Sequence, residues 1–444
     1  MDTGRGRGPH EVRPVSTPLL VGLAVAAAAS VVLLFTFPRE TTPHWGLLGG
    51  FTDINVYRWG GEYLFAGRDL YSEYLHAPPD GDTWRLPMPW TYTPFAALLF
   101  VPLATVSLSM MEALWMIGTL VAMVAVARLM WVWLGYRPGR RLTWAAVLAA
   151  AMMLFTEPFR MTLWLGQINV FLLLLLVWDA SRPAGTRLRG VATGIAAGIK
   201  LTPAFLWFHY VVTRQWRVAA VSVGTFVATI AMGAVVAPGS SLHYWSGGMF
   251  DGARIGIVEA PSNQSVYGVL AWYVYHGPVP TVVWLVGASA AALMGLAAAW
   301  YLHERGFPQL AFVLSGMTGA VASPFSWGHH WVWFLPLMLV LLDLLLRHAR
   351  TGWARIAWVL PLVLYFFVGA WTQSFPSDEQ PDGRWVGTGW FMTSAALEGP
   401  LSPLLREPYL VVWALTMILG VLAARLLGGD QGRPATTSGV QLTL

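Results

Sequence analysis

Long apolar runs, separated by short loops that carry arginine, are the feature of this sequence that most restricts its fold. A helix needs about 20 mainly apolar residues to cross the core of a bilayer, and such runs recur along most of the chain. The pattern predicts an all-α polytopic membrane protein. The expected spans are 18–37, 109–134, 142–155, 165–179, 216–236, 279–301, 308–322, 331–346, 356–373 and 408–427.

The composition agrees with this fold class and excludes several kinds of site. Of the 444 residues, 56% are hydrophobic and 11% are charged, whereas an ordinary soluble domain is about 25% charged. Cysteine is absent, which excludes disulfides, thiolate metal sites and cysteine nucleophiles. The net charge of +5 comes from arginines spread among the apolar runs, so it does not indicate nucleic-acid binding. The first apolar run could be a cleaved signal peptide, but its length favours a span.

The arginines also predict an orientation, because basic residues favour cytoplasmic loops. The basic loops fall on one side, together with both termini, if 92–106 is a re-entrant piece and 190–212 is a hairpin of two short helices. About twelve membrane helices result. The predicted parts are a cytoplasmic basic head at 1–17, a single transmembrane domain at 18–427, a disordered cytoplasmic tail at 428–444, and periplasmic loops at 38–91, 155–164, 237–278, 323–330 and 374–407.

The first outer loop contains a candidate general base. Asp53 follows an apolar span and opens a segment with the apolar spacing of an amphipathic helix. A carboxylate at this place can accept a proton from a sugar hydroxyl. It can equally be the N-cap of the helix, a role that aspartate often has. Tyr57 and Arg58 of the same segment are candidates for substrate binding.

Side-chain amides lie at the outer ends of two other apolar segments. Gln167 and Asn169 stand at the mouth of an otherwise apolar helix, and buried amides there need hydrogen-bond partners. A sugar would supply these partners, and so would a neighbouring helix. Asn263 and Gln264, beside another membrane mouth, are weaker candidates for contact with a polar ligand.

Lys200 is the only lysine of the chain, and it lies at the apex of the predicted hairpin. An ionisable residue at membrane depth is costly and normally faces a cavity that contains a partner. The phosphate of a lipid-linked substrate is an anion that such a lysine would bind. The alternative is a side chain that extends to the membrane interface.

The outer turn SPFSWGHHW, residues 323–331, joins two apolar segments and contains adjacent histidines. On a helix His329 and His330 point about 100° apart, so they do not readily share one metal ion. Donation to a phosphate or sugar oxygen suits them better, with Trp327 as a sugar-stacking or interfacial residue. A structural role is the alternative. The string Asp80-Gly81-Asp82 has the look of a turn, and no metal and no cofactor is expected.

Five motifs, in this order, resemble the GT-C type glycosyltransferases of glycosyltransferase family 87. They are DINVYRWG with the later TYTPFAALLFVPLA, then GQIN, GIKLTPA, NQSVYG and SPFSWGHHWVW, between about residues 51 and 333. The resemblance implies a GT-C fold and a plasma-membrane enzyme that transfers mannose, with inversion, from polyprenyl-phosphate-mannose. The implied acceptor is a glycolipid of the phosphatidylinositol mannoside type, and the implied product has an α-1,2 linkage. It also implies that Asp53 is the catalytic base and that the two histidines belong to the active-site cavity. From the residues themselves we expect Lys200, His329 and His330 to bind the donor phosphate there.

Two positions depart from the pattern of the family. Thr93 stands where the first of two prolines is usual, and Gly328 stands where a larger polar residue is expected. The alternatives are a transferase of another sugar, such as arabinofuranose or glucose, and a non-enzymatic transporter of lipid-linked glycans. Membrane lipid is an expected partner, nucleic acid is not, and no obligate protein partner is evident.

Overall fold

The computed structural model describes residues 12–36, 50–71, 75, 88–183, 185–250, 256–349, 351–377, 380–394 and 399–427. The predicted tail at 428–444, most of the predicted head and the string Asp80-Gly81-Asp82 lie outside these residues.

Helices make up nearly all of the regular structure. The α-helices are α1 (Thr17–Thr36), α2 (Thr52–Phe65), α3 (Pro94–Phe100), α4 (Leu108–Trp133), α5 (Arg140–Met152), α6 (Glu157–Leu165), α7 (Asn169–Ser181), α8 (Val191–Ile199), α9 (Leu206–Val212), α10 (Trp216–Val236), α11 (Pro238–Trp245), α12 (Val266–Leu270), α13 (Thr281–Glu304), α14 (Pro308–Ala322), α15 (Phe334–His348), α16 (Val359–Val368), α17 (Trp390–Ser394), α18 (Ser402–Arg406) and α19 (Pro408–Leu427). Short 3-10 or π turns are η2 (Val101–Thr105), η3 (Thr202–Phe205), η4 (Gly248–Phe250), η6 (Ala271–Tyr275), η7 (Gly328–His330) and η8 (Gly352–Trp358).

A helix overlaps each of the ten expected spans. In the described part of the chain, α1, α4, α10, α13 and α19 are long and apolar enough to cross a membrane, and the bent pair of α6 and α7 makes a sixth candidate. The chain is therefore a largely helical membrane protein with several spans. The figure of twelve membrane helices stays a prediction.

The expected re-entrant piece at 92–106 and the expected hairpin at 190–212 both consist of short helices separated by breaks. Residues 94–105 form α3 and η2. Thr93 begins this piece as an N-cap, because its side chain accepts a hydrogen bond from Ala96 N, and Pro94 follows in the first turn. Residues 191–212 form α8, η3 and α9, as the predicted hairpin of two short helices requires.

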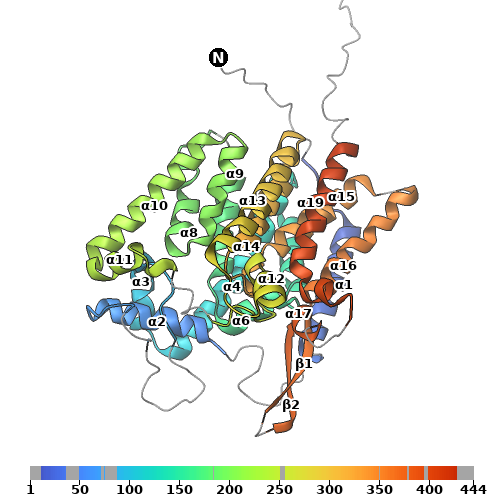
Figure 1. The fold of residues 1–444 in the computed structure, drawn as a ribbon. Coiled ribbons are helices and arrows are strands. Elements are labelled where there is room, and N and C mark those ends of the chain that lie inside the picture. The colour runs from blue at the N-terminus through green and yellow to red at the C-terminus, as the bar shows by residue number, and fades with distance from the viewer. Residues whose placement is uncertain are drawn as a thin grey trace, which may run out of the picture.

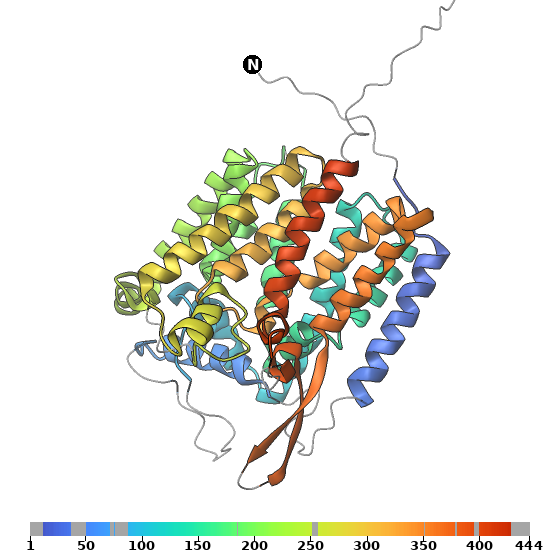
Figure 2. The same ribbon diagram turned by 45° about the vertical axis from the view of Figure 1, so that its right-hand side comes forward.

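The long helices run between two ends of the molecule (Figure 1). We call one the basic end, because the connections that follow α4, α7, α9 and α13 lie there and each contains arginine, and we call the other the site end. The start of α1 and the end of α19 both lie at the basic end (Figure 2). At the site end, α2 lies across the ends of the long helices (Figure 1).

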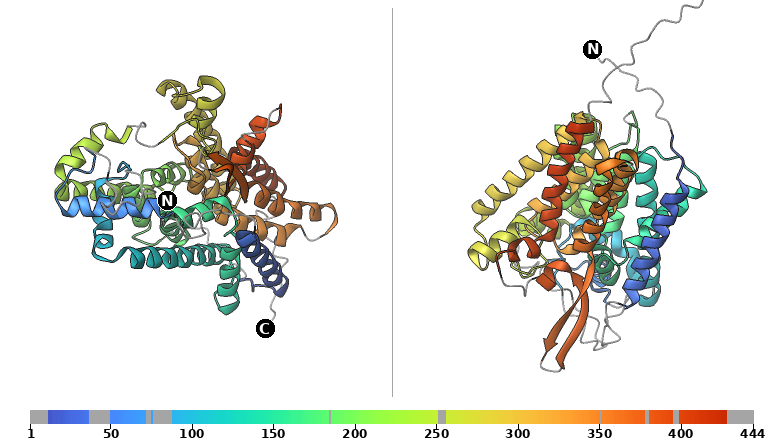
Figure 3. Two further views of the ribbon diagram at one scale, coloured as in Figure 1. Left: turned by 90° about the horizontal axis from the view of Figure 1, so that it is seen from below. Right: turned by 90° about the vertical axis from the view of Figure 1, so that its right-hand side faces the viewer.

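A β-hairpin was not foreseen from the sequence. Strands β1 (Ala370–Ser377) and β2 (Gln380–Gly389) pair antiparallel, and they project from the site end (Figure 3). The expected span 356–373 is therefore too long at its end. Gly369 is extended after α16, and Ala370 N donates to Phe155 O at 2.8 Å, so the backbone leaves the helix there to pair with another segment.

Candidate active site

A sharp break between α6 and α7 supplies the centre of the candidate site. The two helices differ in direction by 118°. Gly166 ends α6 with a φ of 67°, and a Cβ at this residue would lie 2.7 Å from Cγ2 of Ile54. Glycine therefore allows both the left-handed turn and the close approach of α2. The break places Gln167 and Asn169 at the site end, one on each side of Ile168.

Gln167 binds the predicted base. Its Nε2 donates to Oδ2 of Asp53 at 3.0 Å. Its Oε1 accepts from Tyr57 Oη at 2.8 Å and from Tyr92 Oη at 3.3 Å. Gln167 is only 3% exposed, and these contacts fix the amide so that its N–H group points at the carboxylate.

Asp53 lies in the first turn of α2 and does not cap it. The N-cap is Phe51, in a left-handed conformation and without a side-chain hydrogen bond. The capping alternative is therefore not what the structure has. Burial raises the pKa of Asp53 to about 6, although the charge of Lys200 and the hydrogen bond from Gln167 both lower this pKa. A carboxylate with such a pKa is ionised at neutral pH and is a stronger base than an exposed aspartate.

Asn169 binds Lys200, the residue predicted to bind the donor phosphate. Lys200 ends α8, and its Nζ lies 3.0 Å from Oδ1 of Asn169 and 3.0 Å from Nε2 of His330. Asn169 Nδ2 donates to the carbonyl oxygen of His329 at 2.8 Å. The structure thus brings Lys200, Asn169 and both histidines together, on the other side of the break from Asp53.

Both histidines are neutral at this place. Burial and the charge of Lys200 lower the pKa of His329 to about 3 and hold the pKa of His330 well below its usual range. If the ammonium of Lys200 donates to Nε2 of His330, the proton of that imidazole is on Nδ1. Lys200 is then the cation of the cluster, and the imidazoles can only donate neutral N–H groups.

The buried carboxylate of Glu157 packs against the turn η7, which contains both histidines. Glu157 begins α6 and is 4% exposed, and its Oε2 accepts from Tyr409 Oη at 2.8 Å. A Cβ on Gly328 would lie 2.1 Å from that same oxygen. The turn η7 therefore packs directly against the carboxylate of Glu157, and a Cβ at position 328 would require the turn or the Glu157 side chain to shift.

The side chains of four other predicted residues, Arg58, Trp327, Asn263 and Gln264, contact other residues of the chain. Arg58 binds Glu62 at 2.8 Å and donates to carbonyl oxygens of Leu103 and Val106 at the end of η2. Trp327 is half-buried beside Phe325.

Asn263 and Gln264 are occupied by the chain itself. Asn263 Oδ1 accepts from Ser326 N at 2.9 Å, and its Nδ2 donates to Pro324 O at 3.2 Å. Gln264 Nε2 donates to Arg406 O at 2.9 Å. These amides join the outer loop to the histidine turn and to the start of α19. A role of Arg58, Trp327, Asn263 or Gln264 in substrate binding stays a prediction.

Two residues of the site were missed from the sequence. Tyr92 links Gln167 to Tyr57 through hydroxyl contacts, and its ring centroid lies 5.6 Å from Nζ of Lys200. Glu157 is also absent from the candidates selected from the sequence. A carboxylate directly after an apolar segment was the available signal for Glu157, whereas a tyrosine in an aromatic stretch gives no signal of its own. In the described residues, no three side chains of His, Cys, Asp or Glu gather as a metal site would require.

Comparison with known proteins decides the family. The profile of glycosyltransferase family 87 matches residues 90–324, which is more than half of the chain. The chain belongs to glycosyltransferase family 87. The matched range contains Gln167, Asn169 and Lys200, while Asp53 and the two histidines lie outside it.

Relatives of this family 87 chain cover most of its length. The polyprenol-phosphate-mannose-dependent alpha-(1-2)-phosphatidylinositol pentamannoside mannosyltransferase of Mycolicibacterium smegmatis is 34% identical over 78% of the chain and 82% of the relative. The protein of the same name from Mycobacterium tuberculosis is 34% identical over 78% of each. A phosphatidylinositol mannoside mannosyltransferase of M. smegmatis is 30% identical over 77% of the chain and 82% of the relative. No solved structure matches the chain. The family 87 chain is thus a glycosyltransferase.

The two departures from the family pattern have structural reasons. Thr93 is the N-cap of α3, and its hydroxyl also donates to the carbonyl oxygen of Gly198 in α8, two residues before Lys200. Gly328 is the residue that leaves room for Glu157. Both positions therefore serve the packing around the cluster in this family 87 chain.

Proposed function

We propose that the chain transfers mannose from polyprenyl-phosphate-mannose to a phosphatidylinositol mannoside, with inversion, and forms an α-1,2 linkage. The single observation that carries this proposal is the break between α6 and α7. Gln167 holds a carboxylate on one side of it, and Asn169 holds an ammonium group on the other. An inverting transfer needs this division, because the base and the leaving group act on opposite faces of C1.

The reaction follows from these positions. Asp53 accepts the proton of the acceptor 2-hydroxyl while the hydroxyl oxygen forms a bond to C1 of mannose. The bond between C1 and the phosphate oxygen breaks, and its electron pair stays on the polyprenyl phosphate. Lys200 stabilises the negative charge that grows on this oxygen, and an N–H group of the His329 imidazole adds a neutral donor. The β-linked donor thus gives an α-mannoside.

The surroundings of Lys200 support a lipid-linked phosphate. A slot of about 50 Å³ borders His330 and Asn169, and its other walls are mainly apolar side chains of α7, η3 and α14, among them Leu173, Phe205 and Ala320. Apolar side chains beside His330 and Asn169 suit the first part of an isoprenoid chain better than a polar group. A nucleotide would find few polar partners there.

The same proposal assigns the chain to the plasma membrane with its site end outside. The arginine loops gather at the opposite end (Figure 1), and basic loops favour the cytoplasm. The GT-C fold inferred from the sequence belongs to this proposal as well, because its active site faces the extracytoplasmic side.

A donor panel with purified protein tests the proposed function. Polyprenyl-phosphate-mannose and polyprenyl-phosphate-arabinose are each offered with phosphatidylinositol mannoside acceptors, and the products are analysed by mass spectrometry and linkage analysis. We expect product from the mannose donor only, with a new α-1,2 linkage. Consumption of the arabinose donor alone would assign another sugar. If neither donor is consumed and glycolipid instead crosses the bilayer of vesicles, the chain is a transporter.

A further inference from the structure

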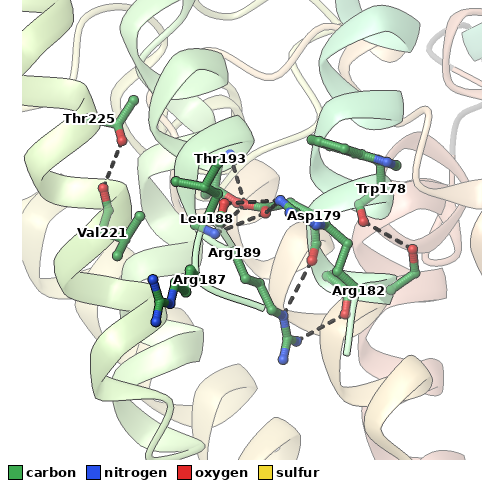
Figure 4. A network of polar contacts seen from close by, with 12 residues as sticks. Trp178, Asp179, Arg182, Arg187, Leu188, Arg189, Thr193, Val221 and Thr225 are labelled. Carbon is green, nitrogen blue, oxygen red and sulfur yellow. Dashed lines mark hydrogen bonds and ion pairs between the residues drawn. The ribbon is translucent and has the colours of Figure 1, made fainter. Parts of the chain in front are cut away.

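A buried carboxylate holds the end of α8 that lies opposite Lys200. Asp179, near the end of α7, is 0% exposed. Its two oxygens each accept from Gly190 N at 2.9 Å. Oδ2 also accepts from Thr193 N at 3.1 Å and from Thr193 Oγ1 at 2.8 Å (Figure 4). Asp179 therefore binds N–H groups in the first turn of α8, which have no partner inside the helix.

Arginines complete the junction between the two helices. Arg189 donates to the carbonyl oxygens of Asp179 and Ala180 at 3.3 and 2.9 Å (Figure 4), so the end of α7 is bound as well. Arg182 lies 3.8 Å from the Asp179 carboxylate and offsets its charge. Thr193 Oγ1 lies 3.1 Å from Tyr210 Oη, which brings α9 into the same junction.

Hydrogen bonds join α7 and α8 near both of their ends, and the two joined positions are equally far apart in each helix. Asn169 and Asp179 are ten residues apart, and so are Gly190 and Lys200. At 1.5 Å per residue each interval is about 15 Å. Asp179 binds Gly190 at the basic end, and Asn169 binds Lys200 at the site end. The bond at one end therefore helps to set the geometry at the other.

Few side chains of α8 itself can fix its position along its axis. Between Val191 and Ile199, Thr193 is the only residue whose side chain can form a hydrogen bond. Gly190, Gly194 and Gly198 face α10, and a Cβ on Gly194 would lie 2.4 Å from the carbonyl oxygen of Ser222. Glycines at this spacing allow close approach of two helices, and the side chains of Thr225 and Thr229 lie against Gly194 and Gly198. The polar contacts at the two ends of α8 add to the register that this packing sets.

We infer that Asp179 is a positioning residue for Lys200: it sets how far α8 carries the ammonium group toward Asn169 and His330. This inference rests on the proposed function, in which Lys200 binds the donor phosphate. Asp179 touches no substrate and acts only through α8. If the carboxylate of Asp179 loses its charge, the first turn of α8 loses charge-assisted hydrogen bonds. Lys200 then moves away from the position in which it stabilises the charge of the transition state.

A double-mutant cycle tests this coupling. Asp179→Asn, Lys200→Met and the double variant are compared in the mannosyl transfer assay. We expect Asp179→Asn to lower kcat on the order of tenfold, to leave the acceptor KM nearly unchanged, and to cause no further loss in the Lys200→Met background. Losses that multiply would overturn the inference, because Asp179 would then act independently of Lys200. If Lys200→Met itself leaves kcat unchanged, the proposed role of Lys200 fails together with this inference.

Two further variants keep the test decisive. Thr193→Val removes one donor to Asp179 and the contact with Tyr210, so it should give a smaller loss of the same kind even if Asp179→Asn does not accumulate in the membrane. Asp343→Asn is the matched control, because Asp343 is a buried carboxylate at the basic end that binds Arg13 and Arg347 at 2.8 and 2.7 Å. We expect it to leave kcat unchanged. An equal, non-additive loss for Asp343→Asn would mean general loosening of the basic end and would contradict the inference.

Discussion

At the scale of single residues, Asp53 and Lys200 influence each other across the break between α6 and α7. Each is bound by an amide, Gln167 or Asn169, and these two residues are separated only by Ile168. The charge of Lys200 lowers the pKa of Asp53, while burial raises it to about 6. Asp53 and Lys200 are therefore electrostatically linked, and removal of the charge of Lys200 should change the pKa of Asp53.

The dependence of the reaction on pH should show this link. The ionised form of Asp53 is the active base, so kcat/KM should fall about tenfold per pH unit below a pH of about 6. Lys200→Met removes the charge that lowers the pKa of Asp53, so the acidic limb should move to higher pH. The measurement is kcat/KM for the acceptor between about pH 4.5 and 8. A limb that stays in place in Lys200→Met would contradict the electrostatic link.

The side chains of the site could be selected from the sequence, but their pairings could not. Asp53, Gln167, Asn169, Lys200 and the histidines are polar residues at unexpected places in apolar surroundings, and the cost of burying such groups makes them visible. The contacts between Asp53 and Gln167 and between Lys200 and His330 join residues more than 100 positions apart. They depend on how the helices pack, which local pattern does not report.

At the scale of elements, the spans were predictable and the irregular pieces were predictable only in part. Apolar length fixes where a membrane helix lies, and a proline after a capping threonine predicts the start of α3. The hairpin of β1 and β2 was missed because its stability depends on pairing between its strands and on contacts such as Ala370 N to Phe155 O. The contact between η7 and the Glu157 carboxylate was also missed, because the two segments are distant in sequence.

The packing of η7 on α6 gives a prediction of its own. Gly328→Ala places a Cβ against the carboxylate of Glu157, so the turn must shift and carry the histidines with it. We expect a destabilisation of about 1–3 kcal/mol, seen as a lower midpoint of thermal unfolding, together with reduced transfer. The control is Gly224→Ala in α10, where no atom lies within 4 Å of the added Cβ. Unchanged stability and activity in Gly328→Ala would show that the position of η7 does not depend on its close contact with Glu157.

At the scale of the whole molecule, charge and chemistry are separated between the two ends. The arginine loops lie at the basic end, whereas α2 and α6, which contain Asp53 and Glu157, lie at the site end (Figure 1). The sequence predicts this separation, because basic residues and outer acidic residues alternate between successive apolar runs. The exact number of crossings is harder to derive, because broken pieces such as α6–α7 and α8–α9 are individually too short for a simple length rule.

The orientation of the two ends can be measured directly, because the natural chain contains no cysteine. Ala66→Cys places a thiol at an exposed position after α2, and Gly185→Cys places one in the exposed loop before α8. A membrane-impermeant maleimide should label Ala66→Cys in intact cells and Gly185→Cys only after lysis. The reverse pattern would put the site end in the cytoplasm and would remove the basis for the proposed orientation.

The most direct measurement compares two carboxylates of the site end in the transfer of mannose from polyprenyl-phosphate-mannose. Asp53→Asn keeps the shape of the side chain but cannot accept the proton, so the rate should fall by about 10²–10⁴-fold, while the protein still accumulates in the membrane and binds the acceptor. Asp69→Asn is the matched control, because among the described residues Asp69 accepts from Tyr71 N and Ser240 Oγ at 3.0 and 2.9 Å, away from the cluster. It should remain within about twofold of the natural protein. A rate for Asp53→Asn that equals the rate for Asp69→Asn would contradict the assignment of Asp53 as the base.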